Sequence, residues 1–165
     1  MPFGVATFFR KAAYNIGGYR FNCDDIEHGV LRGNRGHPYI PGPQFAASDP
    51  RRKTVLKHLD PRIHFALNCA SQSCPPIAVY TPENIDRQLD TAAYNFIDTT
   101  VKILTKKNRL SISPIFKWYM PDFGGHQGVI SFLIKYIHDD DRRRWLSEHP
   151  GAGLIYQTYD WTLNT

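Results

Sequence analysis

The sequence predicts a small α+β fold, and two observations lead to this class. Residues 82–102 carry apolar side chains at helical spacing, and shorter helical patterns follow. Short runs typical of strands, such as residues 109–112, lie between them without the regular alternation of βαβ units. We therefore expect a small mixed sheet packed with several helices and joined by long ordered loops.

The size and composition favour one globular domain. The chain has 165 residues, 42% hydrophobic and 21% charged, so we expect a single domain over residues 1–165 with a buried core. No apolar run reaches 18 residues, so no membrane span is expected. The opening MPFGVATFF lacks the features of a signal peptide, which favours a soluble, cytoplasmic protein.

The first third of the chain begins with a hairpin pattern. In AYNIGGYRF, residues 13–21, two aromatic-containing runs flank Gly17-Gly18. Asn22 or Asp24 can cap a short helix that follows, over about residues 24–32. The segment 33–50 is rich in Gly and Pro and predicts a long loop, with a short helix expected over residues 51–59.

The middle of the chain contains a strand candidate. Asp60-Pro61 predicts a turn, and residues 63–67, IHFAL, are apolar on both faces of an extended chain. Such a run predicts a central, fully buried strand.

The remaining elements follow from start signals and periodicity. Thr81-Pro82-Glu83 is typical of a helix start and opens the helix of residues 82–102. Residues 109–112 predict a strand, and Ser113-Pro114 predicts another helix start. Further expectations, in order, are a loop at 122–125, an amphipathic helix around 129–137, a short helix at 142–148 and an alternating strand at 154–159.

Charge and cysteine usage limit the partners and cofactors. The net charge of +5 comes from short clusters, with no basic stripe interleaved with aromatics, so nucleic acid is not an expected partner. Three cysteines form no repeated disulfide framework, which favours reduced thiols. Cys69 and Cys74 are spaced unlike a zinc motif, so neither a metal nor another cofactor is predicted. The possibility of a disulfide between Cys69 and Cys74 stays open.

Cys69 is the candidate nucleophile because it comes where the expected strand ends and a polar loop begins. A reactive thiol needs a partner that lowers its pKa. Alternation along the expected strand would turn His64 to the opposite face, so the base would come from elsewhere, and His28 and His126 are the candidates. The alternative is that Cys69 is a small buried residue of the core.

Two further acids complete the set of candidate residues. Glu27 and His28 adjoin one another on the short helix, and both can flank a site, although a partly buried structural histidine is an equal interpretation. Asp160 follows the last expected strand and could orient an imidazole as the third member of a triad. It could equally bind backbone amides at a turn.

Several stretches together carry a family resemblance. These are YNIGGYRFNCDDIEHGVLR, DPRIHFALNCASQSCPP, LDTAAYNFI, LSISPIFKWYMPDFG and YDWTLN. In this order and spacing, from about residue 8 to 164, the sequence resembles the domain-of-unknown-function family 547 (DUF547). The matching signature residues are Glu27, His28, Arg32, His64, Cys69, Cys74, Pro75, Asp122, Asp160, Trp161 and Asn164.

The resemblance implies that the activity is unassigned. The sequence departs from the family pattern in one respect. Family domains usually open with an additional helix bearing a segment of the F-W-I-N-x-Y-N type, and this sequence begins after that point. We expect either a truncated chain or a shorter member.

The leading functional hypothesis is a thiol-dependent hydrolase or acyl-transfer enzyme acting on a small molecule or peptide. Cys69 would be the nucleophile, His28 or His64 the base, and Asp160 the residue that orients the base. One alternative is a noncatalytic protein-interaction domain, with aromatics such as Tyr39, Trp118 and Tyr119 meeting a protein partner. Another is an enzyme in which Glu27 and His64 do acid–base work and Cys69 is structural.

Overall fold

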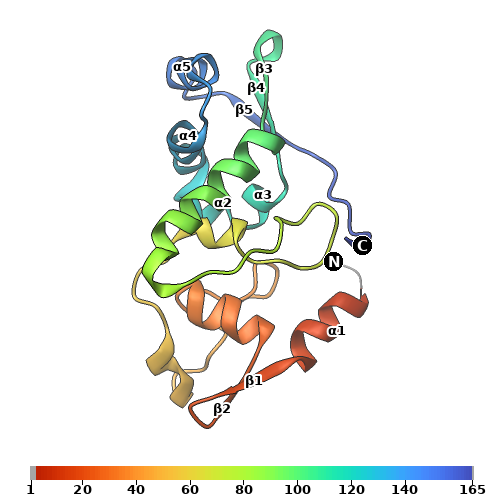
Figure 1. The fold of residues 1–165 in the computed structure, drawn as a ribbon, viewed down its shortest axis with the longest axis vertical. Coiled ribbons are helices and arrows are strands. Elements are labelled where there is room, and N and C mark those ends of the chain that lie inside the picture. Colours follow the sequence, from red (N-terminus) through yellow and green to blue (C-terminus); the bar gives the residue numbers. More distant parts are fainter. Residues whose placement is uncertain (1–2, 165) are drawn as a thin grey trace. The chain divides into compact units, whose positions relative to one another are not determined.

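The computed structural model describes residues 3–164, with side chains from residue 7 onward. It divides into two compact units, residues 1–60 and residues 61–165, each taken by itself below. Helices and two small sheets make up the chain, and the α+β class is confirmed (Figure 1). A single domain over the whole chain stays a prediction. None of the helices in the described part has the length and apolarity needed to cross a bilayer.

The first unit opens with a helix and the expected hairpin. Helix α1 (Phe3–Lys11) precedes strands β1 (Ala13–Ile16) and β2 (Tyr19–Asn22), which pair in antiparallel fashion. Gly17 and Gly18 join them with φ of 59° and 83°. Positive φ at both central residues is the requirement of the tight turn that matches strand twist, so the hairpin prediction is confirmed.

Asn22 begins the next helix, as one of the two predicted caps. Its side chain accepts a hydrogen bond from Asp25 N–H at 2.7 Å, and the Asp25 carboxylate accepts one from Asn22 N–H at 3.1 Å. These reciprocal bonds satisfy two backbone donors at the helix start. The helix that follows, Asp25–Leu31, has the wide π-helical turn.

The long loop of the first unit is tied back to this helix. Phe45 is fully buried, and its ring lies where a side chain on Gly29 would be, 2.3 Å from the position of an added Cβ. The Asp25 carboxylate accepts from Gln44 at 2.9 Å and from Arg51 at 2.8 Å. These contacts explain how a loop without periodicity stays ordered. The helix expected over 51–59 is a shorter 3₁₀ helix, Pro50–Thr54.

The predicted strand at 63–67 is wrong. Pro61–Phe65 forms a 3₁₀ helix, and the Ile63 carbonyl accepts from the N–H groups of Ala66 and Leu67 at 3.0 Å instead of from a neighbouring strand. Proline has the φ of a first helical turn, so Asp60-Pro61 starts a helix here. The expected opposite orientation of His64 and Cys69 rested on this strand and loses its basis.

The second unit contains a three-stranded sheet and the larger helices. Helix α2 (Ile85–Thr100) follows a short 3₁₀ turn, Pro82–Asn84. Strand β4 (Arg109–Ile112) pairs antiparallel with β3 (Lys102–Leu104) and parallel with β5 (Gly153–Tyr156). The helix expected over 82–102 thus ends two residues early, at Thr100. Strand β3, which the sequence pattern did not indicate, begins at Lys102. The last strand also ends earlier than expected, at Tyr156.

Helices α3 (Ile115–Trp118), α4 (Gly125–Tyr136) and α5 (Asp140–Glu148) connect β4 to β5. The predicted loop at 122–125 contains the 3₁₀ turn Met120–Phe123 and the start of α4. The predicted inward face of α4 is confirmed, since the core of this unit includes Val129, Ile130, Leu133, Tyr136 and Ile137.

Candidate functional site

Residues 68–75, here called the thiol loop, hold Cys69 and Cys74. The Asn68 side chain closes the loop, because its amide donates to Pro75 O at 2.6 Å and its oxygen accepts from Ala70 N–H at 2.7 Å. Cys69 N–H donates to the Cys74 sulfur at 2.8 Å. Ala70 has φ of 61°, a left-handed conformation that costs energy for a residue with a Cβ. The loop is therefore a constrained turn that places two sulfurs together.

A distant segment of the second unit holds the thiol loop. Gln72 N–H donates to Thr162 O at 2.9 Å, and Asn164 N–H donates to Ala70 O at 2.9 Å. The same segment supplies Tyr159, which is half-buried. These backbone bonds explain why the stretch YDWTLN accompanies the cysteine motif.

Two hydroxyl groups converge on the Cys69 sulfur. Ser71 Oγ lies 3.1 Å from Cys69 Sγ, and Tyr159 OH lies 3.4 Å from it. The two hydroxyl oxygens also lie 3.1 Å apart, and Ser71 donates to Tyr159 when its proton is not directed at the sulfur. Each hydroxyl can donate to a thiolate, which can only accept hydrogen bonds. The arrangement suits a negatively charged sulfur.

The hydrogen bond from the Cys74 thiol is the largest influence on Cys69. Together with the hydroxyls of Ser71 and Tyr159 and the Ser71 N–H, it lowers the pKa of Cys69 to about 5, although burial acts in the opposite direction. The same hydrogen bond, with burial, raises the pKa of Cys74. Cys74 Sγ also lies 3.8 Å from Leu67 O, a long contact for a thiol donor. The pair thus shares one proton around neutral pH.

Cys23, in the first unit, has the opposite character. Burial raises its pKa, and the neighbouring carboxylates of Asp24 and Glu27 add to the effect. Cys23 therefore serves as the reference for a thiol whose pKa is not lowered. All three cysteines are free.

His64 is held by a carboxylate that the sequence analysis did not assign to it. Its Nε2 donates to Asp122 Oδ2 at 3.0 Å, and both side chains are almost fully buried. The ring stacks on Tyr119, with 3.9 Å between ring centres. An imidazole oriented by a buried carboxylate is the pairing used in catalytic triads. The pairing also has a plain structural use, since it satisfies two buried polar groups.

Glu27 and His28 lie on the π-helical segment of the first unit. His28 is buried, and Arg32 donates to its Nδ1 at 3.1 Å. Because a guanidinium can only donate, the ring proton of His28 is on Nε2. Glu27 Oε1 lies 3.7 Å from the same Nδ1.

Asp160 and His126 both bind local groups. Asp160 is exposed and accepts from the N–H and hydroxyl of Thr162 at 2.9 and 2.7 Å, and these bonds lower its pKa. This is the turn interaction weighed above. His126 Nε2 donates to Ala152 O at 3.0 Å.

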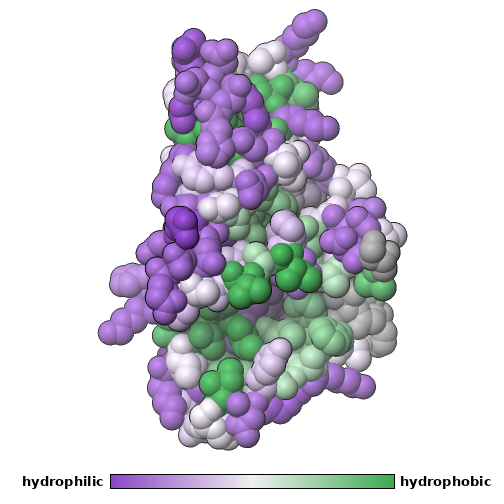
Figure 2. All heavy atoms as spheres, in the orientation of Figure 1, coloured by the Kyte–Doolittle hydropathy of each residue, from purple (hydrophilic) through white to green (hydrophobic). Residues whose placement is uncertain are grey.

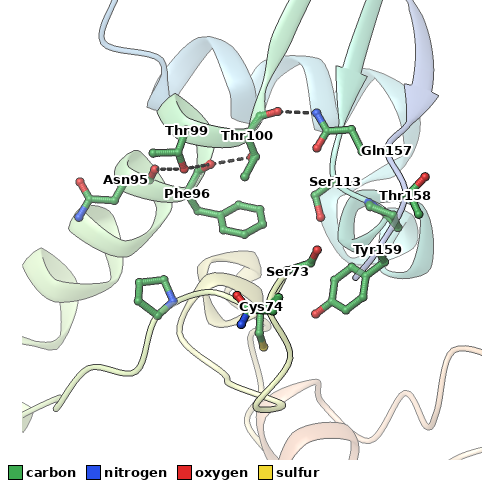
Figure 3. A pocket seen from close by; sticks show the side chains of 13 residues that line it. Ser73, Cys74, Asn95, Phe96, Thr99, Thr100, Ser113, Gln157, Thr158 and Tyr159 are labelled. Carbon is green, nitrogen blue, oxygen red and sulfur yellow. Dashed lines mark hydrogen bonds between the residues drawn. The ribbon is translucent and has the colours of Figure 1, made fainter. Parts of the chain in front are cut away.

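A cavity of about 390 Å³ adjoins the thiol loop. Cys74 and Tyr159 form part of its lining, and Figure 3 shows the Tyr159 hydroxyl pointing toward Cys74 and the Cys74 sulfur pointing away from Phe96. The described lining carries no Asp, Glu, Lys, Arg or His, and its polar groups are hydroxyls and amides. They belong to Gln72, Ser73, Asn95, Thr99, Thr100, Ser113, Gln157 and Thr158. Such a lining suits an uncharged polar group.

No three His, Cys, Asp or Glu side chains gather as metal ligands within the described part of the chain. The residues that sequence analysis missed are Ser71 and Tyr159 at the thiol and Asp122 at His64. Ser71 lies in the quoted cysteine stretch, Asp122 is among the signature residues, and Tyr159 stands beside Asp160 in YDWTLN. These were the available signals.

The comparisons with known proteins identify a family. The family model described as "Protein of unknown function, DUF547" matches residues 3–97, which include the thiol loop and the Glu27–His28 segment. Neither the curated proteins nor the solved structures contain a match. The later stretches, with Asp122 and YDWTLN, lie beyond the matched residues. Since the match covers more than half of the 165 residues, the chain belongs to the DUF547 family of proteins of unknown function.

Proposed function

We propose that this chain is a thiol-dependent enzyme of the acyl-transfer class, with Cys69 as its nucleophile. The observation that carries the proposal is the convergence of the Ser71 and Tyr159 hydroxyls on the Cys69 sulfur, at 3.1 and 3.4 Å. Hydrogen bonds to the charged form favour ionisation. A thiolate formed in this way needs no base before it attacks.

The chemistry begins with attack of the thiolate on an acyl carbon. The sulfur–carbon bond forms, the acyl group is transferred to Cys69, and the leaving group departs. Cys74 keeps its proton tightly, and burial raises the pKa of Tyr159, so both are weak acids toward a leaving group. Donors such as thioesters or activated esters, whose leaving groups depart as anions, therefore suit the site better than amides.

The second half of the reaction passes the acyl group to water or to another acceptor. Water must then lose a proton, and His64, oriented by Asp122, is one proposed base. His28, flanked by Glu27, is the other. Asp160, expected from the sequence to orient the base, binds Thr162 in a local turn, and Asp122 takes that part for His64 in the proposal. The uncharged cavity beside the thiol loop, whose described lining includes Cys74 and Tyr159 but not Cys69, supports an acyl donor with a neutral polar body that extends from the sulfur.

The test measures covalent transfer to each cysteine. The protein is mixed with a nitrophenyl ester or a short acyl thioester, and the acyl adduct is located by peptide mass analysis. The proposal expects the adduct on Cys69, its loss in Cys69→Ser, and no change in the matched control Cys23→Ser. Equal, slow acylation of all three thiols would refute the proposal.

Exposed apolar residues favour the interaction domain as a second candidate. Ile77 and Val79, just after the thiol loop, are 80% and 82% exposed. Figure 2 shows such apolar groups on the surface among hydrophilic ones. Tyr39 is exposed, whereas Trp118 and Tyr119 pack partly against the core. For a binding domain, Cys69→Ser would alter stability without abolishing any reaction.

The third candidate assigns acid–base work to Glu27 and His64, with Cys69 structural. It is favoured by the His64–Asp122 pair alone. It predicts that the Cys69→Ser variant still converts a substrate, whereas the His64→Gln variant does not. The acyl-transfer proposal predicts the loss of conversion in Cys69→Ser.

A further inference from the structure

The acyl-transfer proposal uses one sulfur of the thiol loop, yet the loop holds a second sulfur that accepts a hydrogen bond from the Cys69 backbone. Cys69 N–H donates to Cys74 Sγ at 2.8 Å, which holds the Cys74 sulfur against the Cys69 backbone. The Asn68 side chain fixes both ends of the loop around them. The Cys74 sulfur thus lies at the backbone of Cys69, within the short loop that a disulfide between the two residues would close.

We propose that Cys69 is a site of reversible oxidation by hydroperoxides and that Cys74 is its resolving thiol. The inference goes beyond acyl transfer and does not depend on it. It rests on the hydrogen bond from Cys69 N–H to the Cys74 sulfur and on the hydroxyl groups of Ser71 and Tyr159 at the Cys69 sulfur.

The oxidation takes place in two balanced steps. In the first, the Cys69 thiolate attacks an oxygen of the peroxide; a sulfur–oxygen bond forms, the O–O bond breaks, and the other oxygen leaves as hydroxide or alkoxide. In the second, the Cys74 sulfur attacks the sulfenic acid of Cys69; the disulfide forms, the sulfur–oxygen bond breaks, and the hydroxyl leaves as water with the Cys74 proton. The two cysteines lose two electrons and the peroxide gains them. A dithiol reductant restores both thiols by exchange.

The surroundings of the two sulfurs favour this sequence. Cys69 is only partly buried, so a small peroxide can reach it, and Ser71 and Tyr159 can donate to the departing oxygen. Cys74 keeps its proton until the sulfenic acid has formed beside it. Cys23 lies next to Asp24 and Glu27 and lacks such donors in its described contacts, so oxidation should select Cys69.

Disulfide formation also changes the contacts of Tyr159. Its hydroxyl would lose the thiolate that it now contacts at 3.4 Å. Its ring packs 4.9 Å from Trp118 and 4.4 Å from Trp161, between ring centres. Oxidation of the thiol loop should therefore change tryptophan fluorescence.

The experiment treats the reduced protein with one equivalent of hydrogen peroxide at neutral pH, with dimedone to trap sulfenic acid. Wild type and the matched control Cys23→Ser should form the Cys69–Cys74 disulfide, with a fluorescence change that dithiothreitol reverses. Cys74→Ser should instead give a dimedone adduct on Cys69. Cys69→Ser should consume peroxide at least about tenfold more slowly.

Two results would overturn the oxidation proposal. One is a wild-type protein whose Cys69 passes directly to sulfinic acid without a disulfide. The other is a Cys69→Ser variant that consumes peroxide as fast as wild type. The acyl-transfer proposal fails separately: a protein that forms the disulfide but never an acyl adduct overturns acyl transfer, and one that forms the adduct but no disulfide overturns the oxidation.

Discussion

Replacement of Tyr159 by Phe tests how the thiolate at Cys69 is held. The change removes a hydroxyl 3.4 Å from the sulfur and keeps the ring that packs on Trp161. A hydrogen bond to a charged group contributes about 1.5–3 kcal/mol. Ser71 stays as a donor at 3.1 Å, so the lower end applies. Since about 1.4 kcal/mol corresponds to one pKa unit, the pKa of Cys69 should rise from about 5 to about 6.

The assay is the rate of Cys69 alkylation by iodoacetamide as a function of pH, followed on the Cys69 peptide. The inflection gives the pKa of the thiol directly, whatever the substrate of the protein is. Tyr156→Phe is the matched control, because Tyr156 is another partly buried phenol in the same unit and has no described contact with a cysteine. An inflection that stays at its wild-type pH in Tyr159→Phe, or that moves equally in Tyr156→Phe, would refute the account of the thiolate.

Two predictions concern stability and use urea unfolding. Because folded Cys69 and Cys74 share one proton, the folded pair binds fewer protons than the unfolded thiols from about pH 5 to 8.5 and more protons above that range. The free energy of unfolding should therefore rise up to about pH 8.5 and fall beyond it, and a Cys69→Ser variant that keeps the same maximum would contradict this. Gly29→Ala should destabilise by about 1–3 kcal/mol, because its Cβ would lie 2.3 Å from the Phe45 ring. Gly151→Ala, with no atom within 4 Å of its added Cβ, should change the stability by less than about 0.5 kcal/mol, and equal losses in the two variants would contradict the packing argument.

The fold was predictable where a local pattern determines the element. Gly17-Gly18 fixes a hairpin by its φ values, and the inward face of α4 follows from helical spacing. The run at 63–67 was misassigned because a short apolar run fits a buried strand and a buried helical turn equally well. Pro61 favours the helical turn, because the 3₁₀ helix starts at this residue. The pattern likewise did not indicate α1.

The site was predictable only in part. Cys69 stands out because it follows an apolar run and precedes small polar residues. Its hydroxyl partner Tyr159 is 90 residues away, and the carboxylate on His64 is 58 residues away. Such pairings have no periodicity, since they arise from tertiary folding and not from local conformation. The thiol and its loop neighbours Ser71 and Cys74 could therefore be identified from the sequence, whereas Tyr159 and the pairing of His64 with Asp122 could not.

The separation between Cys69 and Tyr159 has a consequence for protein synthesis. The ribosome makes Tyr159 90 residues after Cys69, which takes about 5–20 s at usual elongation rates. During that interval the nascent chain carries Cys69 without its phenol partner, and the Thr162 and Asn164 contacts that hold the thiol loop are also still missing. The thiol would thus acquire its full reactivity only after this segment has emerged and docked, and the unfinished chain would be spared untimely acylation or oxidation.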